Sequence, residues 1–342
     1  MNNNFNKIYE SSIKNPEDFW QEIADDIFWF KKPNKILNKS KAPFYKWFED
    51  GVTNTCYNAL DIHVDQGRGD KTCLIYDSPI TGSKKQFTYK ELKNKVSKFA
   101  GALTNQGINK GDRVIIYMPM IPEAVIAMLA CGRIGAIHSV VFGGFASNEL
   151  ASRIDDSKAK ILITASCGFE PGKTVEYKPL VDEALKLASH KIDKIILFQR
   201  SGHEVKLNAP KELSWDEVLS NAQNVDCVEM NSNEFAYILY TSGTTGDPKG
   251  AMLTHNNFTS NVRAGLKVIS VTHEDTLLSF LPLSHVFERV VGYYLAIYCG
   301  AEIAYAESPF AVANNMKEVR PTVMASVPRL YEMMHDKILK GV

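Results

Sequence analysis

The chain carries no excess of either charge, because its 39 lysine and arginine residues equal its 39 aspartate and glutamate residues. A balanced charge lacks the basic excess that nucleic acid or an anionic membrane attracts, so neither is expected as the main partner. Long apolar runs are also missing: the charge-free stretch from Val290 to Ala301 is too short to span a bilayer. The N-terminal residues MNNNFNKIYESS lack the apolar stretch of a signal peptide. We therefore expect neither a transmembrane segment nor a secretory leader.

The cysteines form no C-x-x-C pair, which argues against a zinc site or a redox motif of local spacing. Reduced, mostly buried thiols in a cytoplasmic protein are expected instead. The six positions are Cys56, Cys73, Cys131, Cys167, Cys227 and Cys299.

What the chain does have is length and apolar content: 342 residues, of which 45% are hydrophobic, suffice for a large core. From about residue 86, apolar strands alternate with helices, which predicts an α/β fold with largely parallel sheets covered on both faces. Two stacked αβ subdomains are expected, with a boundary near residues 200–230. Residues 1–60 are rich in aromatic side chains that need burial, so a lid of short helices is expected there.

Local signals place the elements. Thr88 and Glu91 have the spacing of a capping box, and Gly107 suits the end of the helix that they begin. Pro122 is expected at the start of the next helix. Further helices are expected over residues 175–189, 255–266, 286–298 and 331–339. Strands are expected over residues 113–118, 136–142, 160–164, 194–198, 235–241, 250–253, 276–280 and 322–326.

Residues 240–250, YTSGTTGDPKG, combine glycines, hydroxyl side chains and a lysine. Glycine lets the backbone approach a ligand closely, and successive free N–H groups in such a turn form a concave anion nest. The glycine spacing is not that of a Walker A loop, and an apolar run from Gly250 to Leu253 follows in place of a helix. An ordinary turn is the alternative. The full pattern favours a loop that binds a polyphosphate through amides, hydroxyls and the Lys249 ammonium.

This loop, with the strand YIL before it, resembles the signature of the AMP-forming acyl-CoA synthetases, whose superfamily includes luciferases and peptide-synthetase adenylation domains. Residues 1–200 are similar to propionyl- and acetyl-CoA synthetases, above all over 54–82 and 111–156. Residues 251–342 instead resemble long-chain fatty-acyl-CoA synthetases and lack the tryptophan-containing segment of short-chain enzymes. The resemblance thus points to two subfamilies. A natural mosaic, a chimera and a misjoined reading frame all remain open.

The resemblance implies the large N-terminal region of the acyl-adenylate-forming fold, without the C-terminal lid domain and its catalytic lysine. Residues 1–60 would form an acetyl-CoA-synthetase-type N-terminal lid, and residues 61–342 an incomplete AMP-binding domain. The implied activity is that of an acid–thiol ligase. A carboxylic acid and ATP give an acyl-adenylate and pyrophosphate, and CoA then displaces AMP. The resemblance of the N-terminal half implies an acid like propionate or acetate, whereas that of the last third implies a fatty acid. Little activity is expected from this chain alone.

The site residues for ATP follow from the same resemblance. The loop is implied to wrap the β- and γ-phosphates, and Thr241 to contact Mg²⁺, an ion that keeps most of its waters and takes few protein oxygens. His285, in PLSHVFE, matches a position near the substrate carboxylate or the AMP phosphate and is the catalytic candidate. A core histidine bonded to the backbone is the alternative. The candidate phosphate-binding residues are Thr241, Ser242, Gly243, Thr244, Thr245, Gly246 and Lys249.

CoA is expected at two short segments that contain glycine. Glu170 stands where many acetyl-CoA synthetases carry an arginine for the CoA 3′-phosphate, but propionyl-type enzymes also show glutamate, and Lys173 remains as the cation. A strand-end turn is the alternative for residues 142–145. The candidate CoA-binding residues are Phe142, Gly143, Gly144, Glu170, Pro171, Gly172 and Lys173.

The helix expected after His285 allows two interpretations. Glu288 and Arg289 at its start form either a solvated pair or part of the site. The apolar segment from Val286 to Ala301 is either an ordinary core helix or the wall of an acyl tunnel, in which Gly292 would leave room for an alkyl chain.

Two other function classes remain open. The chain could be a non-catalytic ATP-binding fragment or interaction module, or an adenylating relative that acts on a carrier protein. The lid at residues 1–60 and the segments 142–145 and 170–173 favour CoA over a carrier protein. The sequence does not indicate the oligomeric state.

Overall fold

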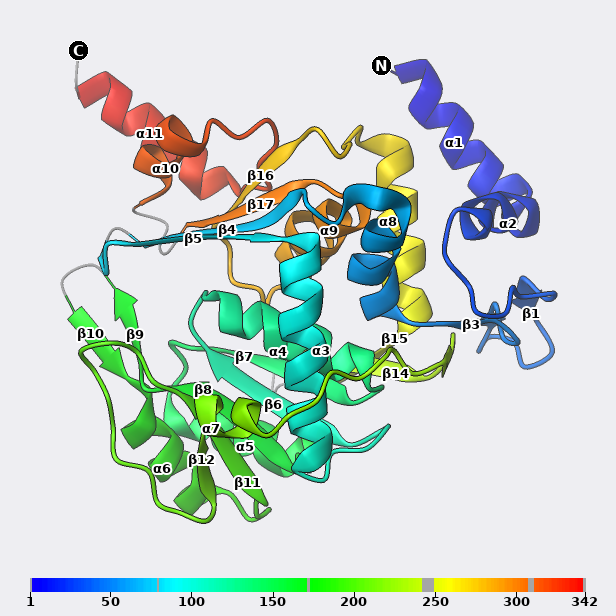
Figure 1. Ribbon diagram of the computed structural model, residues 1–342. Helices are drawn as coiled ribbons and strands as arrows, with labels where there is room; N and C mark the ends of the chain where they lie inside the picture. Colours follow the sequence, from blue (N-terminus) through cyan, green and yellow to red (C-terminus); the bar gives the residue numbers. More distant parts are fainter. Residues whose placement is uncertain (1, 79, 171–172, 242–248, 307–310, 341–342) are drawn as a thin grey trace.

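The computed structural model describes residues 2–78, 80–170, 173–241, 249–306 and 311–340. Figure 1 shows two β-sheets stacked one above the other, with helices between them and on their outer faces. The N-terminal helices lie at one side of this body. The expected α/β architecture with stacked sheets is confirmed.

The larger sheet has seven strands in the order β12-β11-β8-β6-β7-β14-β15. All neighbouring strands are parallel except β14 and β15, which are antiparallel. Strand β8 is buried at every residue, as expected for a central parallel strand covered by helices on both faces. In chain order the strands are β6 (Arg113–Met118), β7 (Ile137–Phe142), β8 (Ile161–Ala165), β11 (Lys194–Phe198), β12 (Glu212–Ser214), β14 (Phe235–Thr241) and β15 (Lys249–Thr254).

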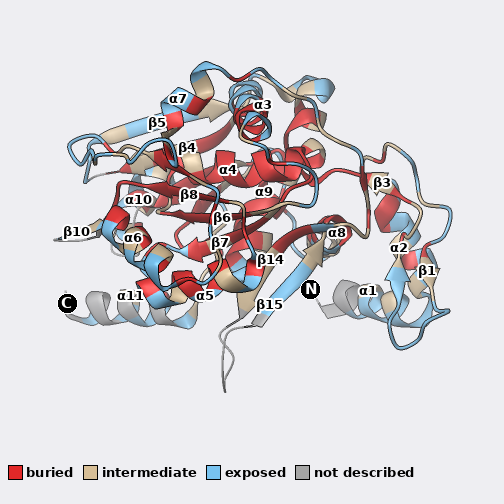
Figure 2. Ribbon diagram, turned by 90° about the horizontal axis from the view of Figure 1, so that it is seen from below, coloured by how far each residue is buried: buried red, intermediate tan, exposed pale blue. Residues whose placement is uncertain are grey.

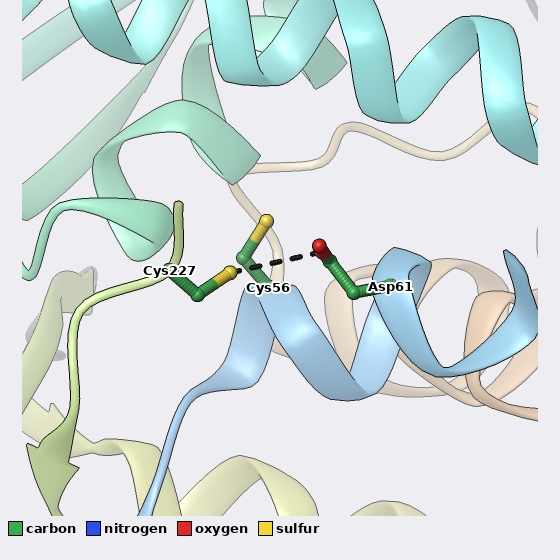
Figure 3. Close-up of side chains that lie close together, drawn as sticks. All are labelled: Cys56, Asp61 and Cys227. Atoms are coloured by element: carbon green, nitrogen blue, oxygen red, sulfur yellow. Dashed lines mark hydrogen bonds between the residues drawn. The ribbon is translucent and has the colours of Figure 1, made fainter. Parts of the chain in front are cut away.

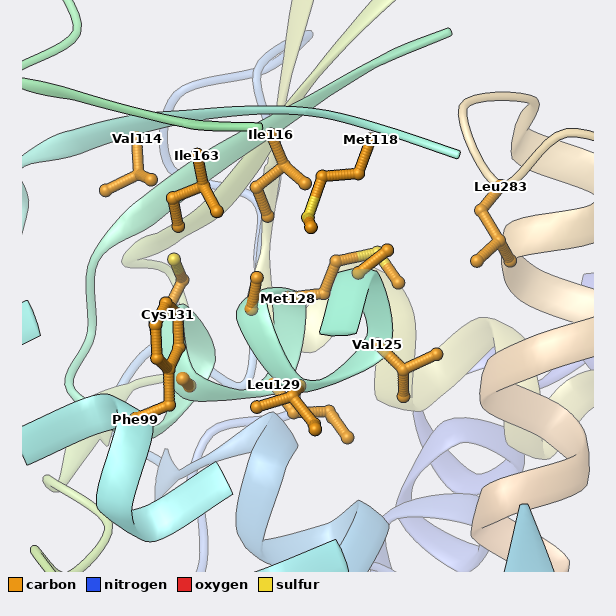
Figure 4. Packing of buried hydrophobic residues seen from close by; sticks show 14 of the residues in the cluster. Phe99, Val114, Ile116, Met118, Val125, Met128, Leu129, Cys131, Ile163 and Leu283 are labelled. Carbon is orange, nitrogen blue, oxygen red and sulfur yellow. The ribbon is translucent and has the colours of Figure 1, made fainter. Parts of the chain in front are cut away.

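Helix α4 (Pro122–Arg133) lies between the two sheets, while α5 (Ser147–Ser157) and α6 (Tyr177–Leu187) lie beyond the larger one (Figure 1). Every residue of α4 except Glu123 is buried, because a helix that is apolar on all sides must be covered on all sides. Figure 4 shows its side chains packed beneath the strands of the larger sheet, with Leu283 approaching from the segment after β16. One continuous core therefore holds the two sheets together.

The smaller sheet has four strands in the order β16-β17-β4-β5. It combines β4 (Thr72–Ser78) and β5 (Ser83–Thr88) with β16 (Thr276–Ser279) and β17 (Glu302–Ala306). Strands from opposite ends of the sequence thus share one sheet. The boundary expected near residues 200–230 falls between β11 and β14, which both belong to the larger sheet. The division of the chain into domains stays a prediction.

The remaining elements cover these sheets, and Figure 2 shows that buried residues gather in the strands and in the helices between them. They are η1 (Tyr57–Asp61), η2 (Val64–Arg68), α3 (Tyr89–Asn105), β9 (Cys167–Glu170), β10 (Lys173–Glu176), α7 (Trp215–Ser220), α8 (His255–Val268), η3 (Glu288–Leu295), α9 (Ala296–Cys299), α10 (Val312–Val319) and α11 (Pro328–Lys340), where η marks π-helical turns.

Most expected elements are confirmed, together with the local chemistry that predicted them. Thr88 and Glu91 form the reciprocal capping box of α3, and Gly107 has φ +89° just after that helix. Two expectations were wrong. Residues 322–326 form no strand, since Val323 makes only an isolated bridge to Leu277. Residues 175–176 belong to β10 rather than to a helix. Several elements were not expected at all, among them α5, β4, β5 and β17.

The N-terminal segment contains two helices, α1 (Asn2–Lys14) and α2 (Pro16–Asp25), followed by turns and two-residue strands. Short helices therefore make up only the first half of this segment, and its role as a lid stays a prediction. Strands β1 (Leu37–Asn38) and β2 (Lys46–Trp47) pair with each other, while β3 (Val52–Thr53) pairs with β13 (Met230–Asn231). A separate small core of the segment contains Ala24, Ile27, Trp29, Ile36 and Phe48. Within the described parts of the chain, no helix is long and apolar enough to cross a membrane.

Candidate functional site

The candidate phosphate loop connects β14 and β15, the two antiparallel strands at one edge of the larger sheet. Thr241 pairs with Lys249 and Tyr240 with Gly250, so the two strands end opposite each other. The loop thus leads into a strand and not into a helix, as the sequence predicts. Ser242, Gly243, Thr244, Thr245 and Gly246 lie outside the described residues. Thr241 and Lys249 are placed as strand ends only, because their side chains are not described.

Tyr240, the next-to-last residue of β14, forms a hydrogen bond with helix α5. Its phenol donates a hydrogen bond of 2.6 Å to the Asp156 carboxylate. Burial and then this hydrogen bond raise the pKa of Tyr240, so the phenol keeps its proton. The Arg153 guanidinium lies 5.1 Å from the centre of the Tyr240 ring. Helix α5 therefore positions the end of β14.

The same arginine contacts the glycine turn that follows β7. Arg153 lies 5.0 Å from the centre of the Phe145 ring, and its own position is held by Glu149, whose carboxylate and backbone carbonyl each accept a bond of 2.7 Å. The phenol of Tyr117 donates to the Phe145 carbonyl at 2.8 Å. Arg153 thus joins two segments far apart in sequence, residues 142–145 and the strand before the phosphate loop.

The first candidate CoA segment and the start of strand β9, which leads to the second, both contact Tyr177. A Cβ atom on Gly143 would lie 2.1 Å from the Tyr177 phenol oxygen, and one on Gly168 would lie 2.6 Å from the same atom. Both backbones therefore pass too close to this ring for any side chain other than hydrogen. Phe142, at the end of β7, is 42% exposed beside this turn. A Cβ atom on Gly144 would lie 2.7 Å from the Phe142 ring, so this glycine too has no room for a side chain.

Strands β9 and β10 form the hairpin that carries the second CoA segment, with Glu170 and Lys173 paired across its end. Pro171 and Gly172 lie outside the described residues, and the Glu170 side chain is not described. Lys173 is exposed and borders a cavity of about 800 Å³, a volume within the usual range for small-molecule sites. The hairpin thus forms one wall of a cavity that the sequence did not reveal.

This cavity is lined by more positive than negative side chains. Lys85, Lys173 and Arg200 lie around it, against Glu123. The Arg200 guanidinium stacks over the Phe169 ring at 4.6 Å. Burial raises the pKa of Glu123, while Lys85 and Arg200 lower it. A cationic cavity with aromatic walls suits a ligand that carries both phosphate and a flat ring.

His285 lies in the turn between β16 and η3 and is exposed. Its amide donates to the Pro282 carbonyl at 2.9 Å, and its Nδ1 accepts from the Phe287 amide at 3.3 Å. The ring is therefore not a core histidine, and it is held at the surface by backbone contacts. Its catalytic role stays a prediction.

Glu288 and Arg289 are fully buried, so the solvated pair considered from the sequence is wrong. Ser279 donates a hydrogen bond to the Glu288 carboxylate at 2.5 Å, while Arg289 contacts His138 and lies 4.9 Å from the Tyr237 ring centre. The two side chains therefore help to join β16, β7 and β14 inside the core.

The segment after them offers no tunnel within the described residues. A Cβ atom on Gly292 would lie 2.2 Å from Glu288 Oε1, so the space beside this glycine is filled by the carboxyl group. Tyr294 and Tyr298 border a cavity of only about 20 Å³, which has room for about one water molecule. The core-helix interpretation of residues 286–298 is the one that these contacts favour.

The sequence interpretation missed Arg153, Asp156, Tyr177 and Arg200. For the first two, the spacing of Leu150 and Ile154 in NELASRIDD was a helix signal that went unused. Tyr177 and Arg200 gave no local signal, since their role depends on contacts with distant turns.

Residues 61–341 match the model of the AMP-binding enzyme family, and residues 5–59 match the acetyl-coenzyme A synthetase N-terminus. The chain belongs to the family of AMP-binding enzymes.

Among its relatives is the human acyl-CoA synthetase short-chain family member 3, mitochondrial, which is 54% identical over 245 residues, covering 71% of this chain and 36% of the relative. The acetyl-coenzyme A synthetase of Pasteurella multocida is 45% identical over 249 residues, covering 72% of this chain and 38% of the relative. The chain therefore spans little more than a third of the length of these curated relatives.

The acetoacetyl-CoA synthetase from Streptomyces lividans has the same fold, with a TM-score of 0.86 at 19% identity over 96% of this chain and 51% of that structure. The acyl-adenylate-forming fold expected from the resemblance is thereby confirmed. The likeness of residues 251–342 to long-chain enzymes stays a prediction.

Proposed function

We propose that this chain forms the ATP- and CoA-binding part of an AMP-forming acid–thiol ligase. The reaction would activate a carboxylic acid with ATP to an acyl-adenylate and pyrophosphate, and then transfer the acyl group to CoA. One observation carries the proposal: Arg153 contacts both Phe145 and Tyr240. The glycine turn expected to bind CoA and the strand that leads to the phosphate loop therefore lie side by side, as two consecutive steps on one acyl group require.

In this proposal the residues 241–246 bind the β- and γ-phosphates, and Lys249 neutralises the leaving pyrophosphate. Such transfer depends on charge neutralisation and on positioning more than on a protein nucleophile. Mg²⁺ would enter with ATP and contact Thr241. The paired ends of β14 and β15 support this arrangement, because they bring the threonine and the lysine to the same end of the hairpin.

The CoA nucleotide would occupy the cavity beside Lys173. Its phosphates would be attracted by Lys173, Lys85 and Arg200, and its adenine by the Phe169 face. The pantetheine arm would pass the turn at Gly144, which is exposed next to the buried Gly143. A carrier-protein substrate would have no use for a nucleotide cavity, so CoA is the better supported acyl acceptor.

The acyl substrate is proposed to be short. One relative's name contains the words short-chain, and Glu288 fills the space beside Gly292 that an alkyl chain would need. A fatty acid, as residues 251–342 suggest by resemblance, is the alternative. The cytoplasmic location expected from the cysteine pattern also stays a prediction, and the name of one relative places that relative in mitochondria.

Binding of Mg·ATP to the purified chain tests the proposal. Titration calorimetry should show saturable binding that Lys249→Ala weakens about ten-fold, equivalent to about 1.4 kcal/mol. Lys249→Arg, the matched control, should retain most of the affinity because it keeps the charge. Equal affinities of wild type and Lys249→Ala would remove the phosphate loop from the proposal.

A further inference from the structure

Three side chains with metal-binding chemistry meet inside the chain, away from the site just described (Figure 3). The sulfur atoms of Cys56 and Cys227 and a carboxylate oxygen of Asp61 all lie within 4.8 Å of one another. Cys56 directly precedes η1, Asp61 ends η1, and Cys227 lies in the segment between α7 and β13. Residues 171 positions apart in the sequence are thus in contact range.

A metal ion does not fit this cluster, because protein cations already fill it. The Arg133 guanidinium donates to Asp61 at 2.7 and 3.1 Å, to the Cys227 sulfur at 3.1 Å and to the Cys56 sulfur at 3.7 Å. The Lys93 ammonium lies 3.1 Å from the same carboxylate. Both oxygens of Asp61 are therefore engaged, and a divalent ion would be repelled by the two neighbouring cations.

What remains is a pair of neighbouring thiols beside a guanidinium. The two sulfurs differ in access: Cys56 is fully buried, whereas Cys227 is only partly buried. Burial, then the adjoining Cys56 and Asp61, raise the pKa of the Cys227 thiol. Cys227 is therefore a thiol at rest.

Hydrogen bonds hold the segment around Cys227, residues 225–228, in place. The Arg133 Nε donates to the Val225 carbonyl at 2.6 Å, and the Val228 amide donates to the Arg133 carbonyl at 2.9 Å. The Asn54 side chain donates to the Val228 carbonyl at 2.9 Å. Residues 225–228 are thereby held against the segment that carries Cys56, which keeps the two sulfurs within 4.8 Å of each other.

We propose that Cys56 and Cys227 form a disulfide by exchange with a low-molecular-weight disulfide such as oxidised glutathione. The more accessible Cys227 loses its proton and attacks one sulfur of the small disulfide, releasing the first small thiol. Cys56 then loses its proton and attacks the Cys227 sulfur of the mixed disulfide, releasing the second. Two protein thiols are oxidised, one small disulfide is reduced to two thiols, and the two protons leave with these products.

The product would connect the N-terminal segment directly to the strand region before β13 and close a loop of about 170 residues. A cross-link over such a long loop restricts the unfolded chain strongly. The oxidised protein should therefore unfold at a higher temperature than the reduced protein, by several degrees.

Disulfide mapping tests the proposal on the intact chain. After incubation with oxidised glutathione, the free thiol count should fall from the six of the sequence by two, and non-reducing peptide mass spectrometry should find a Cys56–Cys227 peptide pair two hydrogens lighter than its parts. Cys56→Ser should instead retain glutathione on Cys227. Cys299→Ser, a control at another partly buried thiol, should form the cross-link like the wild type.

Other outcomes would overturn the proposal. Glutathione retained on wild-type Cys227 without a cross-link would show that the second exchange cannot occur. Cross-links between other cysteines would show that oxidation follows unfolding. Stoichiometric Zn²⁺ binding to the reduced protein that is lost in Cys56→Ser would identify the cluster as a metal site.

Discussion

The phenol of Tyr240 and the carboxylate of Asp156 form a 2.6 Å hydrogen bond that connects strand β14 to helix α5. Tyr240 is the next-to-last residue of the strand that leads into the candidate phosphate loop. The bond is partly exposed to water, so its main effect is expected on the position of the strand end rather than on overall stability.

Tyr240→Phe removes this bond and keeps the aromatic ring beside Arg153. The free energy of unfolding should change by no more than about 1 kcal/mol. The affinity for Mg·ATP should fall about three-fold, because the end of β14 is no longer held by the hydrogen bond to Asp156. Asp156→Asn, which leaves an acceptor for the phenol, is the matched control and should bind nearly as the wild type does. Calorimetric titration measures both. A Tyr240→Phe protein with unchanged affinity would separate this contact from nucleotide binding.

Lys173→Ala tests the cavity beside the β9–β10 hairpin. Loss of the ammonium should weaken CoA binding about ten-fold, because a charge-assisted contact to phosphate is lost. The same substitution should weaken the binding of CoA that lacks the 3′-phosphate by a smaller factor, if that phosphate is the partner of Lys173. Lys206→Ala, an exposed lysine three residues after the cavity-lining His203, serves as the control. Equal CoA affinities for the two variants would contradict the assignment of the cavity.

Gly101→Ala tests the packing of helix α3. A Cβ atom at this position would lie 1.9 Å from the backbone carbonyl oxygen of Gln223, and a backbone atom cannot yield as a flexible side chain can. The free energy of unfolding in urea should fall by roughly 1–3 kcal/mol. In Gly265→Ala, a control within helix α8, the new atom meets only Leu295 Cδ1 at 3.2 Å. Similar stabilities of the two variants would show that the segment at Gln223 moves away easily.

The buried carboxyl group of Glu288 makes stability depend on pH. Burial raises its pKa to about 7, against the lowering effect of the hydrogen bond from Ser279. The folded state therefore holds this proton to a higher pH than the unfolded state, whose pKa is near 4.5. The stability that protonation contributes is complete below about pH 4.5 and is lost as the pH rises through about 7. The loss is on the order of 3 kcal/mol.

Glu288→Gln replaces the carboxyl group by a neutral side chain of the same shape. Its free energy of unfolding should fall less between about pH 5 and pH 8 than that of the wild type, as urea titrations at several pH values would measure. Glu10→Gln changes an exposed residue of α1 and should reproduce the wild-type slope. Parallel curves for wild type and Glu288→Gln would mean that Glu288 reaches water when it ionises.

Local patterns predicted the elements of this fold well wherever a few neighbouring residues decide the structure. The capping box at Thr88 and Glu91 and the apolar strand Arg113–Met118 are examples. The pairing of β4 with β17 could not be predicted in this way, because its partners are more than 200 residues apart. The burial of Glu288 could not be predicted from its neighbours on the helix, because its partner Ser279 lies on strand β16.

The candidate site shows a similar division. The hairpin ends at Thr241 and Lys249 follow from the sequence, since glycine and hydroxyl residues between two apolar strands specify the turn. The contacts of Arg153 with Phe145 and Tyr240 do not follow, because they arise only when β7 and β14 become neighbours in the sheet. The cavity beside Lys173 likewise exists only after β5 has joined the smaller sheet.

The composition of the smaller sheet constrains how the chain folds. Strand β17 lies between β16 and β4, so the hairpin of β4 and β5 lacks its parallel neighbour until residues 302–306 have been synthesised. Closing so long a loop carries a large entropic cost and slows folding. On the ribosome, the strands of the larger sheet emerge first and can pair while residues 72–88 still present an unpaired edge. This edge is where a chaperone would be needed, and where two nascent copies could pair wrongly.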